Sequence, residues 1–255
     1  MSDARVIRAS GVQNFRDFGD WEAENGAQIV RGRLYRSGHW ANAEKAAHHH
    51  LERTGIEVFI DLRRPFERTK QPNVLPDDLG IKTVSSQGAD MEDPPHVKFL
   101  RGGNLTESSV RLYMHGAYRR IPTEEHHQQL FRQTILELIK GRTVLIHCAA
   151  GKDRTGILAA LILGLMGVPK EIILQDYLLT NTAVDIASLL PDIAKRVSKQ
   201  IGQSVEPEVL FPMLGVEPGF LLEAQKVIGS PRKYALEQLG LSLRDLERLK
   251  TSLAV

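Results

Sequence analysis

The 255-residue sequence contains a single cysteine, Cys148. An intrachain disulfide, or a zinc site built on several thiolates, needs at least a second sulfur, so both are excluded. The chain also lacks a strong excess of charge, because 33 basic residues face 31 acidic ones and the formal net charge is +2. This balance gives no reason to expect nucleic acid as a partner, and any bound anion must be held by a local arrangement of charges.

Long hydrophobic runs are missing as well. The longest, at residues 157–168, spans 12 residues, whereas about 20 are needed to cross a bilayer. We therefore expect a buried helix there and no integral membrane segment. The first ten residues lack the apolar core of a secretory signal. Cytoplasmic localisation is the expectation, and export without a signal peptide stays open.

Several common motifs are missing. Gly151-Lys152 is followed by Asp153 instead of Ser or Thr, and no glycine stands five residues before Gly151, so the nucleotide P-loop pattern fails. The chain has neither the Gly-x-Gly-x-x-Gly of a dinucleotide site nor the Gly-x-Ser-x-Gly of a serine hydrolase. The histidine run at residues 48–50 is typical of a solvated helix face, so we expect no metal site there.

Strand and helix patterns alternate along the first two thirds of the chain. Strands are expected at residues 33–36, 56–62, 81–86 and 143–147, the last being the most apolar. Helices are expected at residues 43–53, 108–120, 124–140, 157–168 and 170–179. This order predicts an α/β fold with a central, mostly parallel sheet flanked by helices.

The rest of the chain has a helical pattern divided by prolines. We expect a single domain over residues 1–255, with a core at about 11–182 and a helical elaboration or lid at about 183–255. Residues 87–104 contain several prolines and glycines and are expected to form an irregular loop, itself a candidate lid.

One segment, HCAAGKDRTG at residues 147–156, combines groups that packing alone does not require together. It joins the most apolar predicted strand to a predicted helix, where converging backbone N–H groups favour an anion and the thiolate of Cys148. Arg154, six residues later, can bind two oxygens of a phosphoryl group side by side. These groups indicate in-line attack of sulfur on phosphorus and a phosphocysteine intermediate.

The same segment resembles the H-C-x5-R-[ST] signature of cysteine-dependent tyrosine phosphatases, and within them the atypical bacterial branch whose loop reads HCxxGKDRTG. Further similarities to that branch are Asn-Phe-Arg-Asp at residues 14–17, Gly-Arg-Leu-Tyr-Arg-Ser at 32–37 and Asp-Leu-Arg at 61–63. The resemblance extends over about residues 11–182 and is less sharp in the helical C-terminus.

The resemblance implies a tyrosine-phosphatase-like fold and assigns roles within the loop. Cys148 is expected to be the nucleophile, His147 to hold the loop by hydrogen bonds, and Thr155 to offer its hydroxyl to the thiolate. Phosphate is expected to bind to the residues that follow the nucleophile: Ala149, Ala150, Gly151, Lys152, Asp153 and Arg154.

A general acid is also needed, because the departing oxygen must be protonated. In this family it is an Asp on a separate loop, and Asp90 matches that position best. Asp93, and Asp153 from within the loop, remain alternatives.

The expected activity is hydrolysis of phosphotyrosine in proteins, with phosphoserine, phosphothreonine and phosphoinositides as further substrate classes. No metal or organic cofactor is expected to take part. The alternatives are a phosphoinositide phosphatase for which proteins are incidental substrates, and a catalytically silent module that only binds phosphate. The expected partner is a phosphorylated protein or a phosphoinositide, and the oligomeric state stays open.

Overall fold

A five-stranded sheet runs through the centre of the computed structural model, which describes residues 4–24, 26–87, 95–102 and 105–255. Its strand order is β1-β2-β5-β3-β4, with β2, β5, β3 and β4 parallel and the short β1 antiparallel at one edge. The strands are β1 (Arg16–Asp17), β2 (Leu34–Ser37), β3 (Val58–Asp61), β4 (Lys82–Ser85) and β5 (Val144–His147). The expected α/β fold with a mostly parallel sheet is confirmed.

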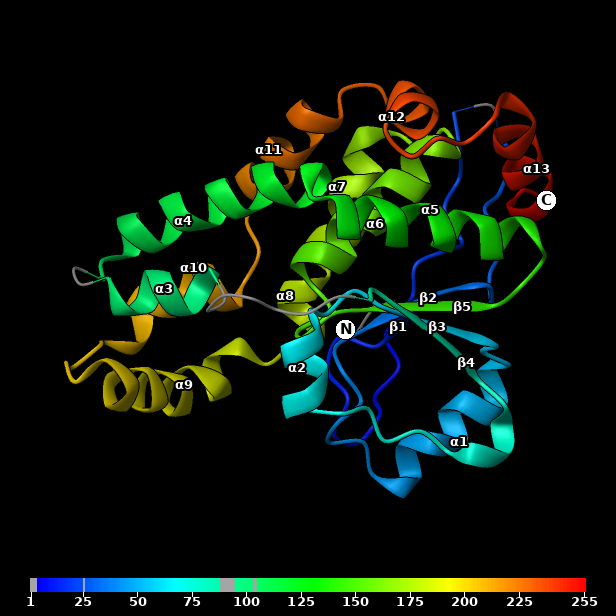
Figure 1. Cartoon of the computed structure of the whole chain (residues 1–255). Helices are drawn as coiled ribbons and strands as arrows, with labels where there is room; N and C mark the ends of the chain where they lie inside the picture. The colour runs from blue at the N-terminus through cyan, green and yellow to red at the C-terminus, as the bar shows by residue number, and fades with distance from the viewer. Residues whose placement is uncertain (1–3, 25, 88–94, 103–104) are drawn as a thin grey trace.

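Helices cover both faces of the sheet (Figure 1). α1 lies on one face, and α5 and α6 lie on the other. The α-helices are α1 (Lys45–Thr54), α2 (Pro65–Lys70), α3 (Pro95–Arg101), α4 (Glu107–Arg120), α5 (Glu125–Ile139), α6 (Asp153–Leu165), α7 (Lys170–Leu178), α8 (Thr180–Ala183), α9 (Ile186–Ile201), α10 (Phe211–Leu214), α11 (Pro218–Ile228), α12 (Pro231–Glu237) and α13 (Leu243–Leu253). Within the described residues, short 3-10 turns join some of them: η1 (Asp77–Leu79), η2 (Ile121–Thr123) and η3 (Pro207–Leu210).

The sheet separates two hydrophobic cores. The larger core joins the sheet to α5, α6 and the C-terminal helices, and the smaller one joins it to α1 through Phe15, Trp40 and Phe59. β5 contributes side chains to both cores, because Leu145 faces one and Ile146 faces the other. Burial on both faces explains why this strand is apolar in sequence.

Strand register brings the functional segments to one edge of the sheet. His147 at the end of β5 lies level with Ser37 at the end of β2 and with Asp61 at the end of β3. In parallel sheets, ligands bind outside the carboxyl ends of the strands. The loop that follows β5 therefore emerges between the ends of two neighbouring strands.

The expectation of an irregular loop at residues 87–104 is wrong for its second part, because Pro95–Arg101 forms α3. A proline is tolerated in the first turn of a helix, where its missing N–H would have no partner. Burial of Leu100 against α9 and stacking of Phe99 on Tyr113, with ring centroids 4.4 Å apart, hold this helix in place. These contacts come from segments distant in sequence.

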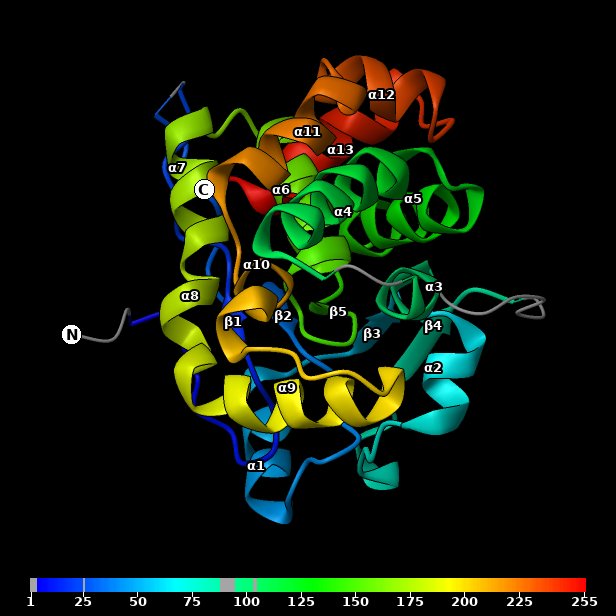
Figure 2. The ribbon, with the colours of Figure 1, turned by 90° about the vertical axis from the view of Figure 1, so that its left-hand side faces the viewer.

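The C-terminal helices form two groups that pack against different parts of the molecule (Figure 2). α9 lies near α3, and residues of α9 and α10 share a third hydrophobic cluster with it. α11 packs on α4, α12 on α6, and α13 on α5, all on the face of the sheet that α5 and α6 cover. Among the described residues, no helix combines the length and the hydropathy needed to span a membrane.

Candidate functional site

A cavity of about 570 Å³ opens at the carboxyl ends of the central strands. Its walls come from α2, α3, α4, α5, α9 and α10, and its floor includes residues 148–150 and 152–154. We call residues 148–154 the Cys148 loop. Every predicted phosphate-binding residue except Gly151 lines this cavity, so the structure brings the sequence-predicted loop residues together in one site.

Gly151 sets the curvature of the Cys148 loop. Its φ is +69°, and a Cβ atom there would lie 2.3 Å from the backbone carbonyl of Ser37. Its carbonyl oxygen accepts hydrogen bonds from Asn14 Nδ2 at 2.8 Å and Arg36 Nη2 at 3.0 Å. Because the peptide is planar and trans, the following N–H of Lys152 points the opposite way.

A buried polar network supports the loop from below. Arg36 Nη1 donates to Asp176 Oδ2 at 2.8 Å, and Arg16 Nη2 donates to the backbone carbonyl of Asp176 at 3.0 Å. Arg16 also contacts the side-chain oxygen of Asn14. The network joins β1, β2 and α7 to the Cys148 loop, and it explains why the motif at residues 14–17 accompanies the cysteine motif although it lies far away in sequence.

Cys148 lies at the end of β5, lines the cavity and is 2% exposed. Thr155, in the first turn of α6, is fully buried, and no described residue makes a hydrogen bond to its hydroxyl. The expected hydrogen bond from this hydroxyl to Cys148 is not formed in the structure, so the role of Thr155 stays a prediction.

His147 is fully buried beside Cys148. Burial lowers the pKa of His147, so the ring is neutral at pH 7. In the matching tautomer, Nδ1 donates to the carbonyl of Cys148 at 3.2 Å and Nε2 accepts from Asn73 Nδ2 at 3.1 Å. Both contacts fix the His147 ring and the backbone beside Cys148. Neither contact requires His147 to act as a base that transfers a proton.

Arg154 projects from the first turn of α6 and forms a two-pronged ion pair with Glu67 of α2. Nη1 donates to Oε2 at 2.6 Å and Nη2 donates to Oε1 at 2.8 Å. Nη1 also donates to the carbonyl of Leu62 at 3.2 Å. A guanidinium has five N–H donors, so Nε and one N–H of Nη2 remain for a phosphate, and they lie on one edge of the group.

The ion pair also fixes the charges of both partners. Burial raises the pKa of Glu67, but the charge of Arg154 and its hydrogen bonds outweigh this effect and lower the value to about 2. Burial lowers the pKa of Arg154, and the charge of Glu67 more than offsets this. Both groups are therefore ionised throughout the physiological pH range.

Asp153 and Lys152, the two further charged residues of the loop, face different surroundings. The Tyr118 hydroxyl donates a hydrogen bond to Asp153 Oδ1 at 2.8 Å. The same hydroxyl oxygen lies 2.5 Å from the hydroxyl oxygen of Tyr177. Lys152 is 3% exposed and donates to the carbonyl of Gly215 at 2.8 Å, with Asp153 Oδ1 3.4 Å away. The Lys152 ammonium thus links the loop to the segment after α10.

Two of the three general-acid candidates, Asp90 and Asp93, lie outside the described residues. Asp153 is the only one of the three that the described part of the chain places, and it lines the cavity.

Sequence reasoning missed Glu67 and Glu124, which line the same cavity. Glu67 does carry a local signal, because its side chain accepts from the backbone N–H of Arg64 at 2.8 Å in a capping arrangement at the start of α2. That signal marks a helix start and says nothing about Arg154, 87 positions away. Only the fold brings the two together.

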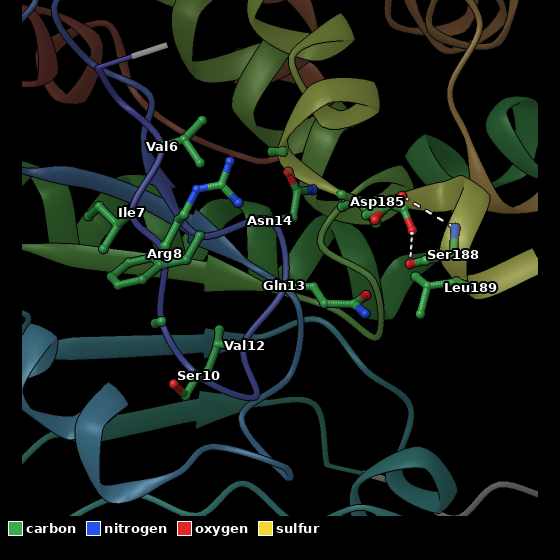
Figure 3. Close-up of a pocket in the computed structure, with 14 residues that line it drawn as sticks. Val6, Ile7, Arg8, Ser10, Val12, Gln13, Asn14, Asp185, Ser188 and Leu189 are labelled. Carbon is green, nitrogen blue, oxygen red and sulfur yellow. Dashed lines mark hydrogen bonds between the residues drawn. The ribbon is translucent and has the colours of Figure 1, made fainter. Parts of the chain in front are cut away.

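A second cavity, of about 380 Å³, lies between the N-terminal segment and the start of α9 (Figure 3). Arg8, Asn14 and Asp185 are among its lining residues, and Asp185 is occupied in capping α9 through Ser188. The described residues that line it include none from the Cys148 loop.

Comparison with known proteins identifies the family. A sequence model described as "Tyrosine phosphatase family" matches residues 7–255. The chain is 30% identical over 280 residues to the triple specificity protein phosphatase PtpB of Mycobacterium tuberculosis, covering 96% of this chain and 98% of that protein. It is 28% identical over 239 residues to a Cupriavidus necator protein with a provisional tyrosine-protein phosphatase name, covering 92% of this chain and 84% of that one. A tyrosine-protein phosphatase of Nostoc commune is 32% identical over 129 residues, covering 50% of this chain and 41% of that protein. The chain therefore belongs to the tyrosine phosphatase family, and it is a protein-tyrosine phosphatase.

Proposed function

We propose that the chain hydrolyses phosphotyrosine in two steps through a phosphocysteine intermediate. The Cys148 thiolate forms an S–P bond while the ester P–O bond breaks, and the leaving phenolate oxygen takes a proton from a general acid. Water then attacks phosphorus, releases inorganic phosphate and regenerates the thiolate. The observation that carries this proposal is that Cys148 and Arg154 line one cavity, with the guanidinium fixed by Glu67.

Arg154 has the geometry that this reaction requires. Glu67 and Leu62 occupy three of its N–H donors, and the remaining two can bind two phosphoryl oxygens side by side. A donor pair held in advance stabilises the charge of the transition state without reorganising during the reaction. Backbone N–H groups of the Cys148 loop supply further donors to the same anion.

Asp153 is the general acid or water-positioning group that the described residues favour. The hydrogen bond from Tyr118 orients its carboxyl group, and the neighbouring Lys152 ammonium lies 3.4 Å away. Asp90 remains the first candidate for an acid on a separate loop, and Asp93 remains the alternative to it. The family resemblance supports Asp90, whereas the contacts in the cavity support Asp153.

The lining of the cavity fits an aromatic phosphate ester. Phe66, Tyr113 and Met114 provide apolar surface against which a phenyl ring can pack. Exposed cations on the rim, Lys70 and Arg196, suit substrates with additional negative charge. Phosphoserine, phosphothreonine and phosphoinositide esters are therefore proposed as further substrates, an extension that the printed name of the PtpB relative, triple specificity, also supports.

Hydrolysis of para-nitrophenyl phosphate tests the chemical proposal. We expect turnover by the native chain, and we expect Cys148→Ser to abolish it while phosphate binding survives. A phosphocysteine trapped by acid quench, and absent in Cys148→Ser, would identify the intermediate. Phosphate binding without turnover in the native chain would instead favour the silent binding module.

Substrate class requires a direct comparison of rates. We propose that kcat/KM for a phosphotyrosine peptide exceeds that for the matched phosphoserine peptide and for a soluble phosphoinositide. A clear preference for the phosphoinositide would support the alternative in which protein substrates are incidental.

The general acid is assigned by three variants, Asp90→Asn, Asp93→Asn and Asp153→Asn. The residue that donates the proton is the one whose loss removes the limb of the pH–rate profile that depends on a protonated acid. The leaving group of para-nitrophenyl phosphate needs little protonation. In the variant that lacks the general acid, and in no other, the rate with para-nitrophenyl phosphate should therefore fall less than the rate with a phosphotyrosine peptide.

A further inference from the structure

Three ligand-bearing side chains meet at the start of α5. Glu124 is the residue before the helix, and His126 and His127 lie in its first turn. One oxygen or nitrogen from each lies within 4.8 Å of the others. Glu124 Oε2 is 3.1 Å from His127 Nδ1 and 3.7 Å from His126 Nε2.

The two imidazoles are poorly satisfied as hydrogen-bonding groups. His127 is 2% exposed, and neither of its ring nitrogens has a well-aligned hydrogen-bond partner among the described residues. The same holds for the buried Nε2 of His126. Buried polar atoms are normally paired, so two of these nitrogens that both lie near Glu124, Nδ1 of His127 and Nε2 of His126, need an explanation.

The distances suggest that explanation. Two ligands about 2.1 Å from a tetrahedral zinc ion lie roughly 3.4 Å from one another, since the angle between them is tetrahedral. The two contacts of Glu124 Oε2, at 3.1 and 3.7 Å, lie on either side of that value. Both separations are compatible with ligand atoms that share one tetrahedral ion.

We propose that Glu124, His126 and His127 form a binding site for a transition-metal ion of the zinc type. Two imidazoles and one carboxylate are a donor set that Zn²⁺ accepts, and three protein ligands leave a fourth position for water or an anion. Glu124 and His127 line the catalytic cavity, so the site is adjacent to the phosphate-binding loop. This site is independent of the proposed phosphatase mechanism, whose steps involve no metal ion.

One neighbouring cation opposes the binding of a metal. Arg64 Nη2 lies 3.3 Å from both oxygens of Glu124. A carboxylate has about four lone-pair positions, so it can keep this contact while Oε2 binds an ion. The Arg64 side chain is also 30% exposed and borders the open cavity, so it has room to move away.

Titration with the metal alone tests the site. The full chain carrying Cys148→Ser serves as the background, because the substitution removes the thiolate as a competing ligand. We expect one equivalent of Zn²⁺ to bind in calorimetry. We also expect Co²⁺ to give the intense visible absorption of a four-coordinate ion, and Zn²⁺ to displace it.

His126→Ala added to that background should weaken Zn²⁺ binding by at least about tenfold, because it removes a direct ligand. The side chain is 30% exposed, so the fold should tolerate the change. Glu124→Gln should weaken binding as well, with circular dichroism checking the fold.

The matched control is His49→Ala, in the exposed histidine run of α1. Unchanged affinity in His126→Ala, or an equal loss in His49→Ala, would overturn the proposal. Absence of stoichiometric binding in the background chain would do the same. None of these outcomes depends on turnover, so failure of the metal site and failure of the phosphatase mechanism are distinguishable.

Discussion

Arg154 illustrates how a single side chain depends on a partner that its own motif does not contain. A guanidinium that rotates freely loses conformational entropy each time it binds an anion. Glu67 already holds the Arg154 guanidinium by two hydrogen bonds. The pair is mostly buried, with side-chain exposures of 17% and 14%. In such surroundings, loss of one partner leaves an uncompensated charge.

Glu67→Gln should lower kcat/KM for para-nitrophenyl phosphate by about 10- to 100-fold, because misplacement of a catalytic group by about 1 Å has effects of that size. The loss should appear mainly in kcat, since the released positive charge still attracts phosphate and limits the change in KM. Steady-state kinetics measure both values. Glu171→Gln, at an exposed position of α7, is the matched control. Equal kinetics in the two variants would contradict the orienting role of Glu67.

At the scale of elements, the Cys148 loop is shaped by what lies beneath it. Gly151 adopts a left-handed φ and packs against the backbone of Ser37, while Asn14 and Arg36 bind its carbonyl. The loop therefore depends on the end of β2 and on the segment before β1 as much as on its own residues.

Gly151→Ala should reduce kcat/KM by at least about 100-fold while the protein stays folded, because the new Cβ displaces the loop from the position that binds phosphate. Gly167→Ala separates this effect from simple backbone strain. Gly167 has a φ of +79°, and a Cβ there meets nothing within 4 Å. Its variant should lose some stability and keep its kinetics, as measured by urea unfolding and para-nitrophenyl phosphate hydrolysis. Similar activity losses in both variants would show that the contact with Ser37 is unimportant.

At the scale of the whole molecule, the C-terminal helices divide into two parts. α9 and α10 contribute Arg196, Gln200 and Met213 to the cavity, so the proposed lid role belongs to this part. α11, α12 and α13 instead pack on α4, α5 and α6. We propose that they stabilise the domain and take no direct part in catalysis.

Leu249→Ala in α13 tests this division. Leu249 is fully buried, and removal of its side chain should lower the free energy of unfolding by about 3 kcal/mol. kcat at 25 °C should stay within about twofold of the native value. Leu243→Ala is the control, because Leu243 in the same helix is 54% exposed and its loss should cost less than about 0.5 kcal/mol. A folded Leu249→Ala variant without activity would contradict the division.

Acid stability is a second property of the whole molecule. The pKa of Glu67 falls from its ordinary value of 4.5 to about 2 on folding. The stability that the Glu67 carboxylate contributes is therefore fully present above pH 4.5 and is lost as the pH falls toward about 2. Between pH 5 and pH 3, this group should account for a loss of about 2 kcal/mol.

Urea unfolding at these two pH values should show that Glu67→Gln loses about 2 kcal/mol less than the native chain does. Glu171→Gln should lose as much as the native chain. An unchanged pH dependence in Glu67→Gln would mean that the buried ion pair does not govern this titration.

The sequence by itself determined the alternation that makes an α/β fold, the apolar central strand at residues 143–147 and the loop that carries Cys148 and Arg154. These features are local, because periodicity, a strand end and a motif of ten residues can be read without knowing the fold. The helix at Pro95–Arg101 was not predicted, since it is stabilised by α9 and Tyr113 and not by its own composition.

Only the tertiary structure decided which side chains meet across long separations. Glu67 reaches Arg154, Asn14 reaches Gly151, and Tyr118 reaches Asp153 because parallel strands bring their carboxyl ends to one edge. His127, beside Glu124, is likewise distinguished only by its burial at the cavity wall, whereas the more conspicuous run at residues 48–50 lies on a helix whose His49 is exposed to solvent. Sequence shows which chemical groups are available, but proximity and burial set their charge and partners, and both arise only when the chain packs.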